Sequence, residues 1–304
     1  MKIAIYLSAV PKNKNQAKLE ILKSFGKGAL INNDEVVYVE DSRIVPCDVA
    51  IMQGFVHKDV SSPHLHLRKC ILENHENTVI IDSNLFQFAD KNLANYYLRY
   101  SLNGIFPNTG FYFDNLLDKD RWTSIQKRLN LNLKEYNKTG SNILLCLQRI
   151  DGWSMCEENV QYWLEKTVAI ISKFSNRKII IRRHPGDRRQ SEIKLPKNCE
   201  FSYTADLLDD LKNAWVTITY NSSPGVASLL NGVPVFVTDP EPRHSQTYPL
   251  CNLDLTTIEN PVYFDRTDWI IRLAQSHWNL DEVSQGKAWE FMKKRLKLLK
   301  PNLC

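Results

Sequence analysis

The sequence lacks several features that mark common protein classes. It has no run of roughly 18 apolar residues, the length that a membrane-spanning helix needs. Its seven cysteines form no CxxC pair and are odd in number, which argues against a zinc knuckle and a disulfide framework. The N-terminal apolar run is broken by Pro11 and lysines, so it predicts a first core strand rather than a signal peptide. We therefore expect a reduced, cytoplasmic compartment.

Motifs of the commonest nucleotide and hydrolase chemistries are also missing. There is no Walker loop, no GxGxxG after the first expected strand and no GxSxG elbow, which excludes the usual ATPases, dehydrogenases and hydrolases. The one DxD-like triplet, residues 118–120, stands where a helix is expected to begin, so helix capping explains it better than a metal. The histidines show no zinc spacing with a third ligand. We expect neither a metal nor an organic cofactor.

The composition is that of an ordinary globular enzyme. Of 304 residues, 43% are hydrophobic, 10% aromatic and 24% charged, which excludes a disordered, collagenous or coiled-coil chain. The net charge is +5, from 39 lysines and arginines against 34 acidic residues. Such an excess permits a polyanionic partner without requiring one.

Short β-branched runs alternate with amphipathic segments, a pattern typical of βαβ units around a parallel sheet. The segment 132–142 is polar and lacks an apolar period, so it resembles a linker. We predict an α/β fold of two Rossmann-like domains facing across a cleft, residues 1–136 and 137–275. A helical tail, 276–304, follows and can pack back on the first domain. Within the first domain, Tyr96–Ser101 is expected to be helical.

Ligands of open parallel sheets bind outside the carboxyl ends of the strands, so the residues that follow each strand are the candidates. The segment KIIIRRHPGDRR, 178–189, places Arg182 and His184 at such an end, with further arginines beside them. Guanidinium forks can grip phosphate oxygens in pairs, so this turn predicts a phosphate cradle. The alternative is a solvated basic turn.

A second strand end carries Asn221, Ser222 and Ser223, followed by a helix that Pro224 and Gly225 open. Two hydroxyls and the free N–H groups of a helix start make an anion site. The alternative is that a serine merely caps the helix.

A third strand end, TDPEPRHSQ at 238–246, offers groups for sugar hydroxyls or a second phosphate. These are Glu241, Arg243 and His244. A proline-rich surface loop without a ligand is the alternative.

A strand that ends in His184-Pro185, paired with a later Ser222-Ser223 at a helix start, resembles a known group of enzymes. These are the capsule-type sialyl- and Kdo-transferases of the GT-B fold, in which His-Pro and Ser motifs hold the phosphate of a donor nucleotide. The resemblance covers roughly the second half of the chain. It implies that His184 and Ser222 or Ser223 contact the donor phosphates.

The wider pattern also looks like glycosyltransferase-like proteins of large tailed bacteriophages. It comprises PCDVAIMQGFVHKD at 46–59, VIIDSNLFQFAD at 79–90 and CLQRIDGWSM at 146–155. Some phage enzymes of this type add sugars to 5-hydroxymethylpyrimidines in DNA. The resemblance implies a DNA-modifying, DNA-binding transferase in the host cytoplasm, with 5-hydroxymethylcytosine or a related base as acceptor.

If the second half binds a nucleotide sugar, the first half should bind the acceptor and supply a general base. Asp82 follows the fourth expected strand and is the first candidate; His57 is the second. Their alternatives are an Asx cap and a surface histidine. Lys12, Lys14 and Lys18 lie on the first loop and helix, where they can contact DNA phosphates or simply keep the helix soluble.

We therefore expect a metal-independent hexosyl- or pentosyltransferase that takes a nucleotide sugar, with a UDP-sugar favoured, as co-substrate. DNA is the expected acceptor, and neither a membrane nor an obligate protein partner is indicated. A surface-polysaccharide transferase that uses a CMP- or UDP-sugar is the rival enzyme. A noncatalytic nucleic-acid-binding protein on a glycosyltransferase fold is the rival of another class.

Overall fold

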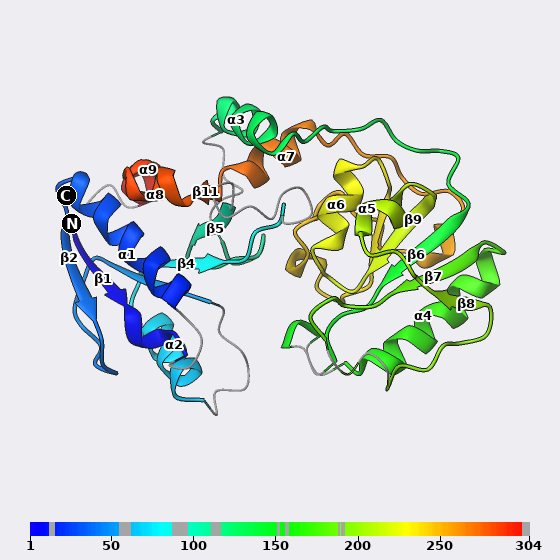
Figure 1. Ribbon diagram of the computed structural model, residues 1–304, viewed down its shortest axis with the longest axis horizontal. Coiled ribbons are helices and arrows are strands. Elements are labelled where there is room, and N and C mark those ends of the chain that lie inside the picture. The colour runs from blue at the N-terminus through cyan, green and yellow to red at the C-terminus, as the bar shows by residue number, and fades with distance from the viewer. Residues whose placement is uncertain are drawn as a thin grey trace. The chain divides into compact units, whose positions relative to one another are not determined.

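Two sheets, each in a unit of its own, organise the chain in the computed structural model (Figure 1). The first unit comprises Met1–Ile125 and Ile271–Cys304, and the second Gln126–Ile270. The structure describes residues 1–11, 16–54, 62–86, 97–110, 117–150, 153–155, 158–187, 189 and 192–299.

The sheet of the first unit has six strands in the order β11-β5-β4-β3-β1-β2. The pairs among β1 to β4 are parallel, whereas β5 pairs antiparallel with both β4 and β11. The strands are β1 (Lys2–Tyr6), β2 (Glu35–Val39), β3 (Val49–Gln53), β4 (Thr78–Asp82), β5 (Tyr97–Leu102) and β11 (His277–Asn279).

Alternation of side chains along these strands gives the first unit two cores. Ile3 and Ile51 pack with α1 (Gln16–Ile31), α8 (Leu280–Ser284) and α9 (Lys287–Leu299). The intervening residues, such as Met52, face α2 (Pro63–Asn74) on the opposite side. The remaining helices near the unit boundary are α3 (Lys119–Leu129) and α7 (Thr267–Ala274).

The second unit has a five-stranded sheet in the order β10-β9-β6-β7-β8, and all its pairs are parallel. Its strands β6, β9 and β10 are almost wholly buried, whereas β7 and β8 toward the other edge are only partly so. Helix α4 covers part of the sheet, where its Val168 and Ile171 belong to one core with Ile143 and Ile181. The strands are β6 (Asn142–Cys146), β7 (Lys178–Arg182), β8 (Cys199–Phe201), β9 (Ala214–Thr219) and β10 (Val235–Val237); the helices are α4 (Val160–Phe174), α5 (Leu207–Leu211) and α6 (Pro224–Leu230).

The predicted α/β class with Rossmann-like parallel sheets is confirmed. The helix expected at Tyr96–Ser101 is wrong, because Tyr97–Leu102 forms β5 between β4 and β11. The C-terminal tail is likewise not all helical, since His277–Asn279 supplies the edge strand β11.

The polar segment 132–142 is hydrogen-bonded along the second unit. The N–H groups of Lys134 and Asn137 donate to the carbonyls of Leu230 and Gly232, at 2.9 and 2.8 Å. Arg266 binds the carbonyl of Lys134 at 2.8 Å. The units consequently change at residues 125 and 270, where the sequence had suggested 136 and 275.

No helix among the described residues is long and apolar enough to cross a bilayer.

Candidate functional site

Four neighbouring strands of the second unit, β10, β9, β6 and β7, end at the same edge of the sheet because all are parallel. Polar segments follow each of them: 147–150 after β6, 183–187 after β7, 220–223 after β9 and 238–244 after β10. This carboxyl edge is where open parallel sheets bind ligands.

A buried chain of hydrogen bonds links three of these segments. Asn221 accepts a bond from Gln148 Nε2 at 2.6 Å and donates through Nδ2 to Asp239 Oδ2 at 2.6 Å. Asp239 Oδ2 in turn contacts His244 Nδ1 at 3.1 Å, and its Oδ1 accepts from the N–H of Glu241 at 2.9 Å. Gln148, Asn221 and Asp239 are only 4%, 8% and 6% exposed. Such buried polar networks fix the geometry of a site when each member finds a partner.

Ser222 stands beside this network with a buried hydroxyl. Within the described part of the chain, its Oγ has no hydrogen-bond partner. Ser223 is the N-cap of α6, and its side chain makes no capping bond. The expectation of free N–H groups at the helix start is wrong for two positions, because Gly225 and Val226 donate to the carbonyls of Ser222 and Ser223. The hydroxyls are therefore the groups that remain for a ligand.

His184 follows β7 in a fixed tautomer. Its Nδ1 accepts the N–H of Gly186 at 3.1 Å, which leaves the ring proton on Nε2. Burial lowers the pKa of His184, and the charge of Arg149 lowers it further, against an opposing effect of Asp187; the balance favours the neutral ring. A Cβ at Gly186 would lie 2.8 Å from Nη2 of Arg149.

Arg182, expected to hold a phosphate, is directed at protein groups. Its guanidinium forms an ion pair with Asp210 at 2.6 Å and donates to the carbonyl of Ala205 at 3.1 Å. Arg183 stacks on the ring of Phe201, with 3.6 Å from Cζ to the ring centre. Arg189 donates to the carbonyl of Ile150 at 2.6 Å. Three arginines of the segment 178–189 thus make contacts within the second unit.

An ion pair between Arg243 and Glu241 lies within the loop that follows β10. Arg243 donates to both carboxylate oxygens of Glu241, at 2.8 and 2.6 Å, and these bonds lower the pKa of Glu241 to about 2. Both side chains remain partly open to solvent. Together with His244 they can contact a ligand at the strand ends.

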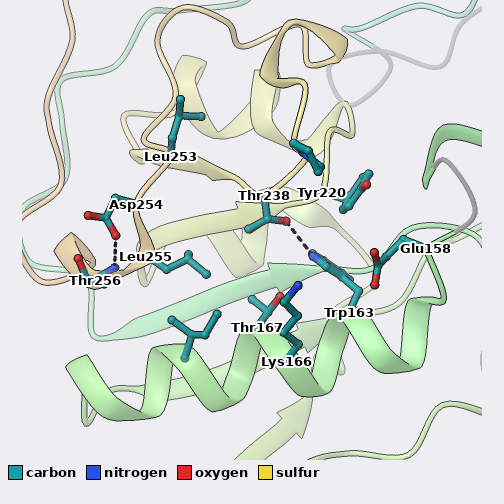
Figure 2. A pocket seen from close by; sticks show the side chains of 12 residues that line it. Glu158, Trp163, Lys166, Thr167, Tyr220, Thr238, Leu253, Asp254, Leu255 and Thr256 are labelled. Atoms are coloured by element: carbon teal, nitrogen blue, oxygen red, sulfur yellow. Dashed lines mark hydrogen bonds between the residues drawn. The ribbon is translucent and has the colours of Figure 1, made fainter.

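A pocket of about 320 Å³ lies next to these strand ends, between α4 and the loop that follows β10 (Figure 2). Trp163 forms its floor, meets Tyr220 edge to face and donates to Thr238 Oγ1 at 2.8 Å. Lys166 and Glu158 stand at its rim in Figure 2. The pocket therefore combines an aromatic wall with polar groups near the ends of β9 and β10.

In the first unit, Asp82 is fixed at the end of β4. Its Oδ2 accepts from Arg99 at 2.6 Å, and Arg99 also binds the carbonyls of Ser83 and Ile105 at 3.0 and 3.1 Å. The Asp82 side chain is 22% exposed, so solvent or a ligand can reach it.

The loop after Asp82 is anchored by a buried histidine. His277 Nε2 accepts the N–H of Leu85 at 3.3 Å, and Nδ1 binds the carbonyl of Leu273 at 2.9 Å. Complete burial lowers the pKa of His277 to about 3. The ring is therefore a neutral structural link between this loop and the C-terminal segment.

Of the other residues predicted to serve the acceptor, only Lys18 lies in the described part of the chain. Lys18 lies in the first turn of α1 and is half-buried. His57, Lys12 and Lys14 lie outside the described residues.

Sequence reasoning missed Gln148, Asp239, Arg99 and His277. Gln148 and Asp239 directly follow strands β6 and β10, so the strand-end rule applied to every strand would have found them. Arg99 and His277 carry no such signal, because both lie within strands, β5 and β11, rather than after one. β11 also joins the sheet from a distant part of the sequence. No group of three potential metal ligands gathers within the part of the chain that the structure describes.

No protein-family model and no curated protein matches the sequence. Among solved structures, Thermosulfurimonas dismutans KpsC, beta Kdo 2,4 transferase, aligns with a TM-score of 0.54 at 14% identity, over 90% of each chain. KpsC, beta Kdo 2,7 transferase, from the same organism, aligns with a TM-score of 0.52 at 13% identity, over 95% of this chain and 99% of that one. The α/β fold of this chain is thus shared with transferases of known structure. The chain has the fold of the GT-B glycosyltransferases.

Proposed function

We propose that this protein transfers a sugar from a nucleotide-sugar donor to a hydroxyl of a saccharide acceptor, and that the second unit binds the donor. The observation that carries the proposal is the hydrogen-bond network of Gln148, Asn221, Asp239 and His244. Beside it lies the Ser222 hydroxyl, which is buried and has no hydrogen-bond partner in the described part of the chain. A buried hydroxyl without a partner costs about 1–3 kcal/mol, which a ligand oxygen at this edge would recover. The fold supports the same reaction class.

The donor phosphates are assigned to three groups at the strand ends. The hydroxyls of Ser222 and Ser223 donate to phosphate oxygens, and the neutral ring of His184 donates through Nε2. Donors aimed at the leaving phosphate stabilise the negative charge that develops there. This set needs no metal, which is itself part of the proposal.

Asn221, Asp239 and their neighbours shape the remainder of the donor site. Asn221 holds Asp239, and Asp239 orients His244 toward the ligand side of the loop. We assign Glu241 and Arg243 to the hydroxyls of the sugar. Arg182 receives a bracing role, because its guanidinium is paired with Asp210.

The reaction needs a base that removes the proton of the acceptor hydroxyl. Its oxygen forms the new bond to the anomeric carbon while the nucleotide phosphate departs with the electrons of the old one. Asp82, at the partly open end of β4, is the proposed base, with His57 as the second candidate.

The acceptor is proposed to be a saccharide of the surface-polysaccharide type, because the two aligned transferases act on Kdo sugars by name. The DNA acceptor expected from the sequence has no support among the aligned structures and stays a prediction.

Mass spectrometry of acceptors incubated with the whole protein tests the proposal. The donors are CMP- and UDP-sugars; the acceptors are an acidic oligosaccharide, a neutral oligosaccharide and duplex DNA that contains 5-hydroxymethylcytosine. We expect one added sugar mass on an oligosaccharide. Mass gain on DNA alone would replace the proposed acceptor, and no transfer or donor cleavage with any pair would refute the enzyme.

A further inference from the structure

Basic side chains gather at the carboxyl edge of the first unit's sheet. Lys18 stands in the first turn of α1 and His64 in the first turn of α2, while Arg68 follows one turn later on α2. Neither helix has an acidic residue in its first turn, and the N-cap of α2, Ser62, makes no side-chain capping bond. Helix N-termini carry partial positive charge, so cationic side chains are unfavourable there unless an anion binds.

Arg68 is built into this edge. It is 4% exposed, and its Nε donates to the carbonyl of Ala9, just after β1, at 3.0 Å. Its guanidinium also lies against Gly54, directly after β3, where an added Cβ would come within 2.6 Å of Arg68 Cζ. The lack of a side chain at Gly54 thus leaves room for the buried guanidinium of Arg68 at the end of β3.

The three basic groups act on one another. Burial lowers the pKa of Lys18, and the charge of Arg68 lowers it further. Burial, Arg68 and Lys18 together lower the pKa of His64, and burial lowers that of Arg68 to about 10. Asp82 opposes the effect on Lys18 and Arg68, yet its carboxylate is shared with Arg99. Positive charge is therefore in excess among these described groups.

Two buried amides lie at the ends of the neighbouring strands β3 and β4. Gln53 is the last residue of β3, and Asn84 follows β4. They are 6% and 1% exposed, and within the described part of the chain Gln53 Oε1 and Asn84 Nδ2 have no hydrogen-bond partner. Along β3, Gln53 shares the α1 face of the sheet with Ile51, below the helix that carries Lys18. Gln53 Oε1 can accept a hydrogen bond and Asn84 Nδ2 can donate one. This pair suits a ligand that carries hydroxyls in addition to an anionic group.

We propose that this edge cluster, formed by Lys18, His64, Arg68, Gln53 and Asn84, binds a carboxylate or phosphate group of the acceptor saccharide. The assignment of the ligand as acceptor rests on the proposed function; the anion site itself does not. The acceptor of this enzyme is accordingly an acidic saccharide.

Calorimetry at low salt tests the site with three probes: glucuronate, glucose 6-phosphate and neutral glucose. The whole protein is compared with Lys18→Gln and with Lys23→Gln, an exposed position on the same helix. We expect at least one anionic probe to bind about tenfold more tightly than glucose, and Lys18→Gln to lose about tenfold in that affinity. The preferred probe separates a carboxylate from a phosphate site.

Lys23→Gln should bind within about twofold of the wild type, and nucleotide affinity should be unchanged in both variants. The unliganded Lys18→Gln protein should melt no lower than the wild type, because the substitution removes repulsion at a helix start. Equal binding of glucose, equal effects of the two variants, or a lower melting temperature for Lys18→Gln would overturn the proposal. Lys18-dependent binding without any sugar transfer would keep this site and remove the proposed function.

Discussion

Asn221 connects the segments at the carboxyl edge of the second unit's sheet. It joins Gln148, the carbonyl of Ser154 and Asp239 through three hydrogen bonds of 2.6, 2.7 and 2.6 Å. These partners come from segments that lie far apart in the sequence. A single small amide thus orders the ends of three strands.

Asn221→Ala should lower the free energy of unfolding by about 2–3 kcal/mol, because it removes one hydrogen bond from each of the buried side chains of Gln148 and Asp239. Urea unfolding measures the change. Asn176→Ala, at an exposed position, serves as the control and should stay within about 0.5 kcal/mol of the wild type. Equal stability of the two variants would show that the network contributes little.

His277 should make stability depend on pH. Its pKa is about 3 in the folded protein against 6.5 in the unfolded chain, so the unfolded chain binds more protons below pH 6.5. Its contribution is complete above pH 6.5 and falls by about 1.4 kcal/mol for each pH unit below that.

Urea unfolding of His277→Gln between pH 7.5 and 5 should show lower stability at pH 7.5 and a shallower decline toward pH 5. His66→Gln, at an exposed site, should keep the wild-type slope. An unchanged slope in His277→Gln would contradict the role of this group.

At the scale of elements, local patterns predicted the parallel strands well. β1, β4, β6 and β9 are short, largely buried runs, and such runs need only their neighbours in sequence to be recognised. β5 could not be predicted in this way, because its alternation of Leu98, Tyr100 and Leu102 becomes meaningful only against β4 and the distant β11. The helical expectation failed there for that reason.

The candidate site likewise contains residues that local sequence could predict and residues whose contacts depend on distant elements. Ser222, Asn221 and His184 stand directly after strands and were found by that position alone. Arg182 pairs with Asp210 of α5 instead of facing a ligand. The sequence could not predict this pair, because it does not show where α5 packs. Arg68 sits in mid-helix and was invisible until the backbone brought it to Gly54.

The turn at the end of β3 should tolerate no side chain. Gly54 has a φ of +97°, and a Cβ would meet the Arg68 guanidinium at 2.6 Å. Gly54→Ala should therefore lower the free energy of unfolding by about 1–3 kcal/mol in thermal or urea unfolding. Gly54→Asn separates the causes, because asparagine tolerates positive φ. If it is as stable as the wild type, the contact with Arg68 is not limiting.

At the scale of the whole molecule, the structure shows where part of the positive charge is used and where the C-terminal segment packs. The net charge of +5 is spread over the sequence, yet Arg182 and Arg189 are committed to internal contacts. The C-terminal segment returns to the first unit, where Trp289 and Lys293 bind Asp34 at 2.6 and 2.8 Å. Two units result, each with polar groups at the carboxyl edge of its own sheet.

The central claim is that the second unit binds the phosphates of a donor nucleotide through Ser222. Calorimetry with UDP and CMP on the wild type, Ser222→Ala and the exposed control Ser172→Ala tests it most directly. We predict that Ser222→Ala weakens binding about tenfold while its free energy of unfolding does not fall, because the lost hydroxyl has no hydrogen-bond partner among the residues that the structure describes. Nucleotide affinity that is equal in all three proteins, or absent in the wild type, would contradict the claim.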